Sequence, residues 1–169
     1  MNRLIDILNR IRRNQRLEWL TVSQRKAFDV IQERLRFLDE VNLYGEHGVG
    51  KTFLGWVLQA CELADYAPRL DDVKPTFMQH TIVIDNLGWR RTEAREALYH
   101  CHNLGYHKVV LITKELVQEQ MSTIELTLTD MDIAMVIDNL RSIHVIPYSD
   151  VPQTLWDLVC PLMRKEGEH

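Results

Sequence analysis

The segment Gly45–Thr52, with the sequence GEHGVGKT, decides the fold. It matches the phosphate-loop pattern G-x-x-x-x-G-K-[ST] at every fixed position. In this pattern the glycines let backbone N–H groups curl around phosphate oxygens, and the following helix directs its positive end at them. We expect Lys51 to contact the β- and γ-phosphates of a nucleotide and Thr52 to place its hydroxyl on Mg²⁺. The loop residues expected to bind the nucleotide are Gly45, Glu46, His47, Gly48, Val49, Gly50, Lys51 and Thr52.

Apolar runs and helical spacings alternate on both sides of this loop. The run VNLYG at 41–45 predicts a strand before it, and residues 51–64 have helical periodicity after it. Two further apolar runs, at 80–85 and 108–113, predict buried strands, and residues 92–105 predict a helix closed by a glycine. Alternating strands and helices favour a parallel sheet with helices on both faces. We therefore predict an α/β fold with three αβα layers and a mostly parallel central sheet.

The remaining segments predict helices before the loop and a short extension after the core. Residues 3–18 predict a basic amphipathic helix, and residues 23–38 a second helix that Ser23 caps. We expect a short helix over 114–121 and a strand over 122–127.

Three parts of the chain are expected to pack as one domain. They are the basic helix at 1–20, the nucleotide-binding core at 21–128 and a C-terminal extension at 129–169. We expect the extension to be short and partly helical, partly strand, with the apolar run IHVIP at 143–147 and an amphipathic stretch at 151–163.

The pentapeptide VIDNL occurs twice, at 83–87 and at 136–140. Each copy runs from apolar residues into an Asp, as a magnesium-binding strand does. We expect the metal-binding Asp to end a strand that lies beside the strand before the phosphate loop. The first copy follows a polar loop, has consecutive apolar residues and precedes Gly88, which predicts a strand ending at Asp85.

The second copy has the spacing of a helix. Either Thr129 or Asp130 can cap it, and the acidic pair Asp130 and Asp132 is favourable in its first turn. We therefore assign the metal to Thr52 and Asp85 and expect Asp138 to be a solvated helix residue. The predicted apolar stripe contains Ile133, Val136, Ile137 and Leu140, with Asp132, Asp138 and Asn139 away from it.

Four segments together resemble P-loop ATPases of the AAA+ and STAND type, the additional-strand group. Residues 42–58 look like their Walker A segment, and residues 82–89 like their Walker B segment and its exit. Residues 109–115 look like their sensor-1 strand, and residues 122–140 like their fifth strand and the turn that opens the next helix. The resemblance covers about residues 20–140 and implies a P-loop NTPase fold that binds ATP and Mg²⁺.

The resemblance also implies catalytic roles, and the sequence departs from the family in three ways. Thr113 ends the fourth strand, where the family senses the γ-phosphate. Asn86 follows Asp85 where hydrolysing members usually carry an acidic residue, and Asn is a poor general base. The interval from Lys51 to Asp85 leaves room for a short strand or none, and the helical lid is reduced. The candidate catalytic residues are Lys51, Asp85, Asn86 and Thr113.

A few side chains outside these motifs are further candidates. Gln24 has the placement of the adenine-reading glutamine of P-loop helicases, because a Gln amide can pair with adenine. Arg90, Arg91 or Arg141 could act on a neighbouring subunit's nucleotide as an arginine finger. Lys114 could sense the γ-phosphate. An ordinary surface residue is the alternative in each case.

Composition limits the class of protein. The chain has 169 residues, 46% of them hydrophobic and 26% charged, as in a soluble globular domain. Its three scattered cysteines predict reduced thiols and a cytoplasmic protein. Because no run approaches 18 apolar residues, we expect no membrane span.

The N-terminal arginines and a group of histidines support weaker predictions. The net charge of −4 argues against a general nucleic-acid coat, although residues 1–20 hold five arginines and could touch nucleic acid. That role is not favoured, since such a helix more often packs its apolar stripe on protein. His100, Cys101, His102 and His107 lie close together, but His100 and His102 do not share a helix face, so zinc is not favoured either.

The sequence therefore predicts an ATP-binding protein that hydrolyses ATP slowly with Mg²⁺. We expect it to act as a nucleotide-gated subunit of a larger assembly, either with a partner protein or with copies of itself. Two alternatives stay open, a non-hydrolysing ATP-binding interaction module and a small phosphotransferase. The sequence does not distinguish ATP from GTP.

Overall fold

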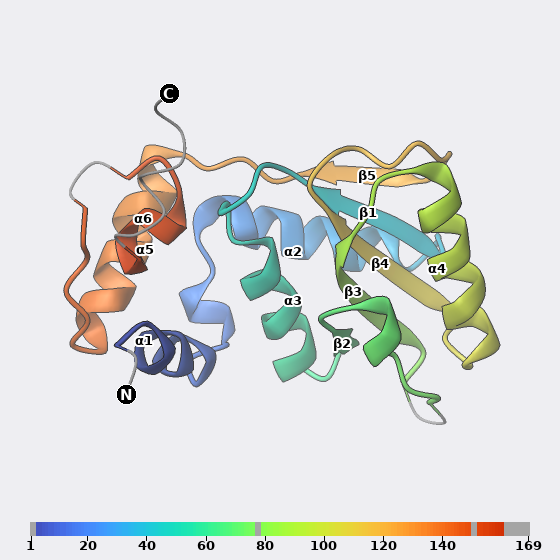
Figure 1. Cartoon of the computed structure of the whole chain (residues 1–169), viewed down its shortest axis with the longest axis horizontal. Helices are drawn as coiled ribbons and strands as arrows, with labels where there is room; N and C mark the ends of the chain where they lie inside the picture. Colours follow the sequence, from blue (N-terminus) through green and yellow to red (C-terminus); the bar gives the residue numbers. More distant parts are fainter. Residues whose placement is uncertain (1–2, 77–78, 150–151, 161–169) are drawn as a thin grey trace.

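A five-stranded sheet with helices on both faces forms the body of the protein (Figure 1). The computed structural model describes residues 3–76, 79–149 and 152–160. The helices are α1 (Arg3–Arg12), α2 (Val22–Arg34), α3 (Lys51–Ala60), α4 (Arg91–Asn103), α5 (Asp130–Ser142) and α6 (Leu155–Val159). The strands are β1 (Glu40–Tyr44), β2 (Asp65–Ala67), β3 (Thr81–Leu87), β4 (Lys108–Thr113) and β5 (Ser122–Glu125). Short 3-10 helices lie at Leu17–Trp19 and Leu70–Asp72.

The strands are parallel and lie in the order β2-β3-β4-β1-β5. The predicted three-layer α/β fold is confirmed. The expectation that the strand of Asp85 lies beside the phosphate-loop strand is wrong, because β4 pairs with both β1 and β3 and separates them. The short interval between Lys51 and Asp85 holds the three-residue strand β2.

Alternate residues of the central strands enter two different apolar clusters. Val83 and Val110 face α2 and α3, whereas Ile82 and Val109 face α4. This alternation follows from the two-residue period of a strand, and both faces are apolar because helices cover both. The consecutive apolar residues that predicted buried strands are thereby explained.

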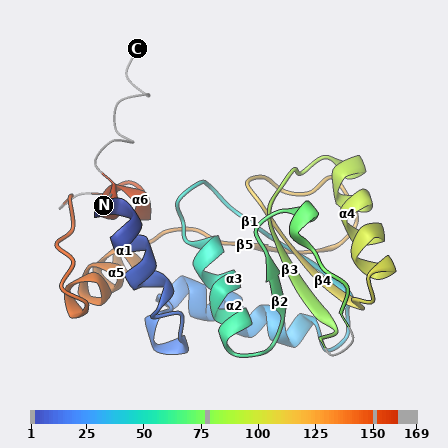
Figure 2. The same cartoon turned by 60° about the horizontal axis from the view of Figure 1, so that its bottom comes forward.

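A third apolar cluster joins the two ends of the chain. We call α1, α5 and α6 the terminal helices; they lie together, away from α4 and the far edge of the sheet (Figures 1 and 2). Ile7 of α1, Leu140 of α5 and Leu158 of α6 are buried in this cluster. Among the described residues, no helix is both long and apolar enough to cross a membrane.

Both N-terminal helices differ from the prediction at their ends. The first ends at Arg12 rather than at residue 18, and the chain then turns so that Trp19 is buried. The second helix is capped by Thr21 and not by Ser23, and it ends at Arg34 rather than near residue 38. Thr21 forms a capping box with Gln24, which satisfies backbone N–H groups at the helix start.

Two later predictions are also wrong. Residues 114–121 form bends and irregular backbone instead of a short helix, because the N–H groups of Val117 and Gln118 donate to Asn42 Oδ1 and Trp89 O. Residues 143–147 are not a strand, since Val145 N–H donates to Leu140 O at the end of α5. In the predicted amphipathic stretch, residues 152–160 are described and contain α6, whereas 151 and 161–163 lie outside the described residues.

The second VIDNL copy lies within α5, as its helical spacing predicted, and Thr129 caps that helix. Asp138 is exposed there and pairs with Arg141 at 3.5 Å. Asp132 lies away from the predicted apolar stripe and is nevertheless buried, with 0% exposure. Its carboxylate accepts hydrogen bonds from the backbone N–H and the hydroxyl of both Ser23 and Thr129. This buried carboxylate therefore ties α5 to the start of α2.

We expect Asp132→Ala to lower the free energy of unfolding by about 3 kcal/mol, because it leaves several buried donors without their acceptor. Burial opposes ionisation of Asp132, but the hydrogen bonds from Thr129 and Ser23 outweigh it and hold its pKa at about 2. Since the folded pKa lies below the ordinary 3.8, the stabilisation is present above pH 4 and is lost as the pH falls towards 2.

Urea denaturation at several pH values checks this prediction. Asp138→Ala on the same helix is the matched control, and it should change the free energy of unfolding by less than about 0.5 kcal/mol. Equal effects of the two substitutions would contradict the structural role of Asp132.

Candidate functional site

The phosphate loop connects β1 to α3 and takes its shape from glycine. Gly48 and Gly50 have φ of +83° and +93°, a left-handed conformation that side chains rarely adopt. Gly50 directly precedes α3, so the backbone N–H groups of the loop and of the first helical turn lie together. Val49 points inward and is buried in the core, whereas Glu46 and His47 are exposed. The loop can therefore offer several N–H donors to an anion.

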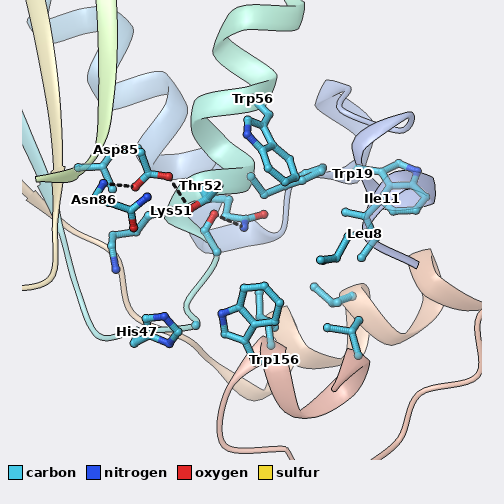
Figure 3. A pocket seen from close by; sticks show the side chains of 18 of the residues that line it. Leu8, Ile11, Trp19, His47, Lys51, Thr52, Trp56, Asp85, Asn86 and Trp156 are labelled. Carbon is cyan, nitrogen blue, oxygen red and sulfur yellow. Dashed lines mark hydrogen bonds between the residues drawn. The ribbon is translucent and has the colours of Figure 1, made fainter. Parts of the chain in front are cut away.

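Lys51 and Thr52, in the first turn of α3, lie where the motif predicts them (Figure 3). Lys51 Nζ donates to Gly45 O and Glu46 O at 2.6 and 2.8 Å, so the ammonium group closes over the loop. Burial lowers the pKa of Lys51, and the nearby carboxylates of Asp85 and Glu46 offset part of this effect. An anion bound in the loop would compensate this partly desolvated charge.

Asp85 is only 3% exposed and lies in β3, which ends two residues later at Leu87 and not at Asp85 as predicted. Thr52 Oγ1 donates to Asp85 Oδ2 at 2.7 Å, and Tyr66 Oη donates to the same oxygen at 2.7 Å. Burial and the Asp85 carboxylate both raise the pKa of Tyr66, so its hydroxyl stays protonated and acts as a donor. The structure thus brings Thr52 and Asp85 together and adds Tyr66, which the sequence analysis missed.

Asn86 directly follows Asp85 in β3, and its side chain is exposed. Its backbone N–H donates to Asp85 Oδ1 at 2.8 Å, and its side-chain Nδ2 donates to Pro68 O at 3.2 Å. Its φ of +53° is left-handed, a conformation that Asn adopts more readily than most residues. Asn86 therefore lies at the site but offers an amide in place of a carboxylate.

Thr113 ends β4 and is buried rather than open to solvent. Its hydroxyl accepts a hydrogen bond from Asn42 Nδ2 at 2.8 Å and donates to Glu115 O at 2.7 Å. Asn42, in the middle of β1, also accepts from Val117 N–H through Oδ1. These bonds hold the segment after β4 at the same sheet edge as the phosphate loop.

Gln24 lies beside the phosphate loop, but both ends of its amide are occupied. It is 2% exposed; Oε1 accepts from Thr21 N–H at 3.0 Å, and Nε2 donates to Gly50 O at 3.1 Å. This side chain therefore links the start of α2 to the phosphate loop. The amide keeps one more N–H and one more lone pair, so these bonds alone do not prevent Gln24, which lines the cavity, from pairing with a base.

A cavity of about 610 Å³ opens beside the phosphate loop (Figure 3). Lys51, Thr52 and Asp85 line its polar end. Side chains of the terminal helices, α3 and the 3-10 helix before α2 line its apolar end. The apolar lining includes Leu8, Ile11, Trp19, Phe53, Trp56, Val136, Leu140, Leu155, Trp156 and Val159. Its volume is within the usual range for small-molecule sites, about 300–1,000 Å³.

The segment that contains α6 touches the phosphate loop directly. Leu155 N–H donates to Gly48 O at 3.0 Å. The rings of Trp156 and His47 stack with their centroids 6.3 Å apart and an interplanar angle of 14°. His47 is exposed, but one face of its ring lies against Trp156 of α6.

The other charged candidates lie on the surface around the site. Lys114 is exposed and lines the cavity, and its backbone carbonyl accepts from Gly45 N–H. Arg90 is exposed at the start of α4, and Arg91 Nε pairs with Glu119 at 3.0 Å. Arg141 pairs with Asp138 and is not among the residues that line the cavity.

The histidines around α4 do not converge. Cys101 is buried, and His102 Nδ1 lies 2.9 Å from Tyr106 O. His107 lies instead near His80, with ring centroids 5.4 Å apart. Within residues 3–76, 79–149 and 152–160, no group of three or more His, Cys, Asp or Glu side chains is placed to hold a metal ion.

Several arginines of the basic helix make contacts within the chain. The guanidinium of Arg3 lies over the Tyr148 ring at 4.7 Å, and that of Arg12 over the Trp56 ring at 5.6 Å. Arg10 pairs with Asp6 at 2.9 Å. The helix therefore packs on its own domain through both its apolar stripe and part of its charge.

Sequence reasoning missed Tyr66, Asn42 and the tryptophans of the cavity. Asn42 left a signal, because it is a lone amide in the apolar run VNLY. Tyr66 left none, since it lies in a segment without periodicity. The tryptophans Trp19, Trp56 and Trp156 are far apart in the sequence and line one cavity only when the terminal helices have packed.

Comparisons with known proteins support the fold alone. The chain matches no protein-family model and no curated protein sequence. Among solved structures it is similar to a crystal structure described as a DNA replication initiation factor, with a TM-score of 0.50 and 14% sequence identity. The match covers 75% of this chain and 53% of that one, so the chain spans about half the length of its structural neighbour. The likeness supports a P-loop NTPase-like fold but not the STAND subgroup.

We expect Gln24→Ala to lower the free energy of unfolding by about 1 kcal/mol, because it removes half of a capping box and the hydrogen bond to Gly50 O. Thermal or urea denaturation measures this change. Gln32→Ala, further along the same helix, is the control and should cost less than about 0.5 kcal/mol. If the two variants are equally stable, Gln24 does not tie α2 to the phosphate loop.

Proposed function

We propose that this protein binds a nucleoside triphosphate, ATP in the first instance, together with Mg²⁺. The proposal rests on one observation: three groups lie together at one end of a large cavity. These are the phosphate loop, the Thr52 hydroxyl and the buried carboxylate of Asp85. Several N–H donors, one ammonium group and a carboxylate are the set that a magnesium-bound triphosphate requires.

The donor set at this end suits a magnesium ion. Thr52 Oγ1 and Asp85 Oδ2 lie 2.7 Å apart, and hydroxyl and carboxylate oxygens are the hard ligands that Mg²⁺ prefers. Thr52 and Asp85 would hold the ion, which would neutralise phosphate charge when bound. Lys51 would leave its loop carbonyls for the phosphate oxygens, where its charge is better compensated.

The apolar end of the cavity supports binding of a nucleobase. Trp19, Trp56 and Trp156 line it and offer aromatic faces. A base that enters there would move from water into apolar and aromatic surroundings, which favours binding. This contribution does not depend on hydrogen bonds to the polar groups of the base. We expect weak discrimination between ATP and GTP, because the lining at this end is mostly apolar and the amides of Gln24 and Asn139 each already give one N–H to a backbone carbonyl.

Slow hydrolysis is the catalytic activity that the site supports best. Phosphoryl transfer depends mainly on positioning and charge neutralisation, which the loop, Lys51 and the ion would supply. Asn86 could orient a water molecule but would not take its proton efficiently. A non-hydrolysing binding module remains the alternative, and Asn86 supports it; a phosphotransferase would need a second substrate site.

The contact between α6 and the phosphate loop supports a role as a nucleotide-gated subunit. Leu155 N–H and the Trp156 ring touch Gly48 and His47, so phosphates in the loop would change the surroundings of α6. The terminal helices could pass this change to a partner protein or to a second copy of the chain. The partner could also be nucleic acid, although Arg3, Arg10 and Arg12 already make contacts within the chain.

We expect ATP with Mg²⁺ to bind the wild type, and Lys51→Ala to weaken this binding by about ten- to a hundredfold, since charge-assisted hydrogen bonds to phosphate are lost. Titration calorimetry measures the affinity, and phosphate release measures turnover. Lys26→Ala, an exposed change on α2, is the control.

The same assays separate the alternatives. Phosphate release by the wild type above that of Lys51→Ala supports the ATPase. ATP binding without such release supports the non-hydrolysing module, and release that depends on a cosubstrate supports a phosphotransferase. If wild-type protein does not bind ATP, the proposal fails.

A further inference from the structure

The carboxylate of Asp85 is held by a residue outside the phosphate-loop motifs. Tyr66 Oη and Thr52 Oγ1 each donate to Oδ2 at 2.7 Å, and Asn86 N–H donates to Oδ1 at 2.8 Å. A hydroxyl that donates its hydrogen keeps its oxygen lone pairs, so Thr52 can still bind a cation. Tyr66 differs from Thr52, because its hydroxyl arrives from β2 and not from the loop helix.

The Tyr66 ring is positioned by its neighbours on two elements. On β2, Tyr66 pairs with Val83 of β3, two residues before Asp85, so the ring starts close to the carboxylate. On α3, a Cβ added to Gly55 would lie 2.9 and 3.0 Å from two carbons of this ring. Trp56 meets the ring edge-on, with centroids 6.5 Å apart and an interplanar angle of 77°.

This packing explains why a glycine lies inside α3. Glycine is, after proline, the least favourable residue in a helix interior. Gly55 has ordinary helical backbone geometry, so a turn or cap does not require it. Space for the Tyr66 ring does require it, and the ring in turn brings the hydroxyl to Asp85.

We propose that Tyr66 is a positioning residue for the divalent cation site of Thr52 and Asp85, and that Gly55 provides the space for its ring. The inference rests on the proposed binding of a magnesium nucleotide. Tyr66 holds the Asp85 carboxylate in one orientation. Oδ2 then accepts two hydrogen bonds and Oδ1 accepts one, so one of the roughly four acceptor positions of the carboxylate, on Oδ1, would be left for the cation. Hydrogen-bond partners of metal ligands commonly change metal affinity by about 10–100-fold.

The chain offers a matched control on the same strand. Tyr106 Oη donates to Asp65 Oδ2 at 2.7 Å, and Asp65 directly precedes Tyr66 on β2. Neither Tyr106 nor Asp65 lines the cavity. Tyr106→Phe therefore removes the same type of hydrogen bond from β2 without touching Asp85.

The test is the affinity for ATP, measured by titration calorimetry on the full chain in EDTA and in Mg²⁺. For the wild type we expect Mg²⁺ to tighten binding. For Tyr66→Phe we expect that gain to fall about tenfold, while the affinity in EDTA changes less than twofold. For Tyr106→Phe both affinities should equal those of the wild type.

Other outcomes overturn the inference. A full magnesium gain in Tyr66→Phe would show that the hydroxyl does not position the cation site. An equal fall of both affinities, or the same loss in Tyr106→Phe, would show a general structural effect. Absence of wild-type binding in both buffers would instead refute the nucleotide proposal, which distinguishes the two failures.

A second variant tests the ring placement with the hydroxyl still present. We expect Gly55→Ala to displace the Tyr66 ring and to reduce the magnesium gain as Tyr66→Phe does, and thermal unfolding would confirm that the variant is folded. Folded Gly55→Ala protein with the full magnesium gain would contradict the role assigned to Gly55.

Discussion

The position of β4 between β1 and β3 is the constraint on which the candidate site depends. Parallel strands place their carboxyl ends at one edge, so the phosphate loop, Asp85 and Thr113 meet there. The inserted strand also keeps β1 and β3 apart, and Thr52 bridges that gap from the first turn of α3. Asn42 adds side-chain bonds from β1 to the end of β4 and the segment beyond it. The site is thus a consequence of strand order.

The terminal helices form the side of the cavity that faces this edge of the sheet. Their apolar cluster joins α1 to α5 and α6, so both ends of the described chain contribute to one side of the cavity. The same helices reach the phosphate loop, through Leu155 N–H on Gly48 O and through the ring of Trp156 on His47. The phosphate loop and the terminal helices therefore share contacts, so a change in the conformation of one alters the surroundings of the other.

The local sequence pattern was sufficient to predict the fold and part of the candidate site. The apolar runs located β3 and β4, and the spacing in the second VIDNL copy identified α5. Local pattern did not find contacts between distant residues, such as the carboxylate of Asp132 on Ser23 or the hydroxyl of Tyr66 on Asp85. It also predicted a helix at 114–121, where hydrogen bonds to Asn42 and Trp89 favour irregular backbone. Such bonds depend on tertiary packing.

The backbone conformation at position 86 favours Asn, in addition to the effect that Asn has as a poor general base. The ladder between β3 and β4 shifts register between Ile84 and Leu87, and Asn86 takes a φ of +53° at this irregularity. Asn tolerates a left-handed backbone better than most residues, whereas a long Glu side chain gains no such allowance. The irregularity in this ladder thus favours the amide. Backbone geometry and poor basicity act in the same direction, because both favour an amide that is a poor general base at the position after Asp85.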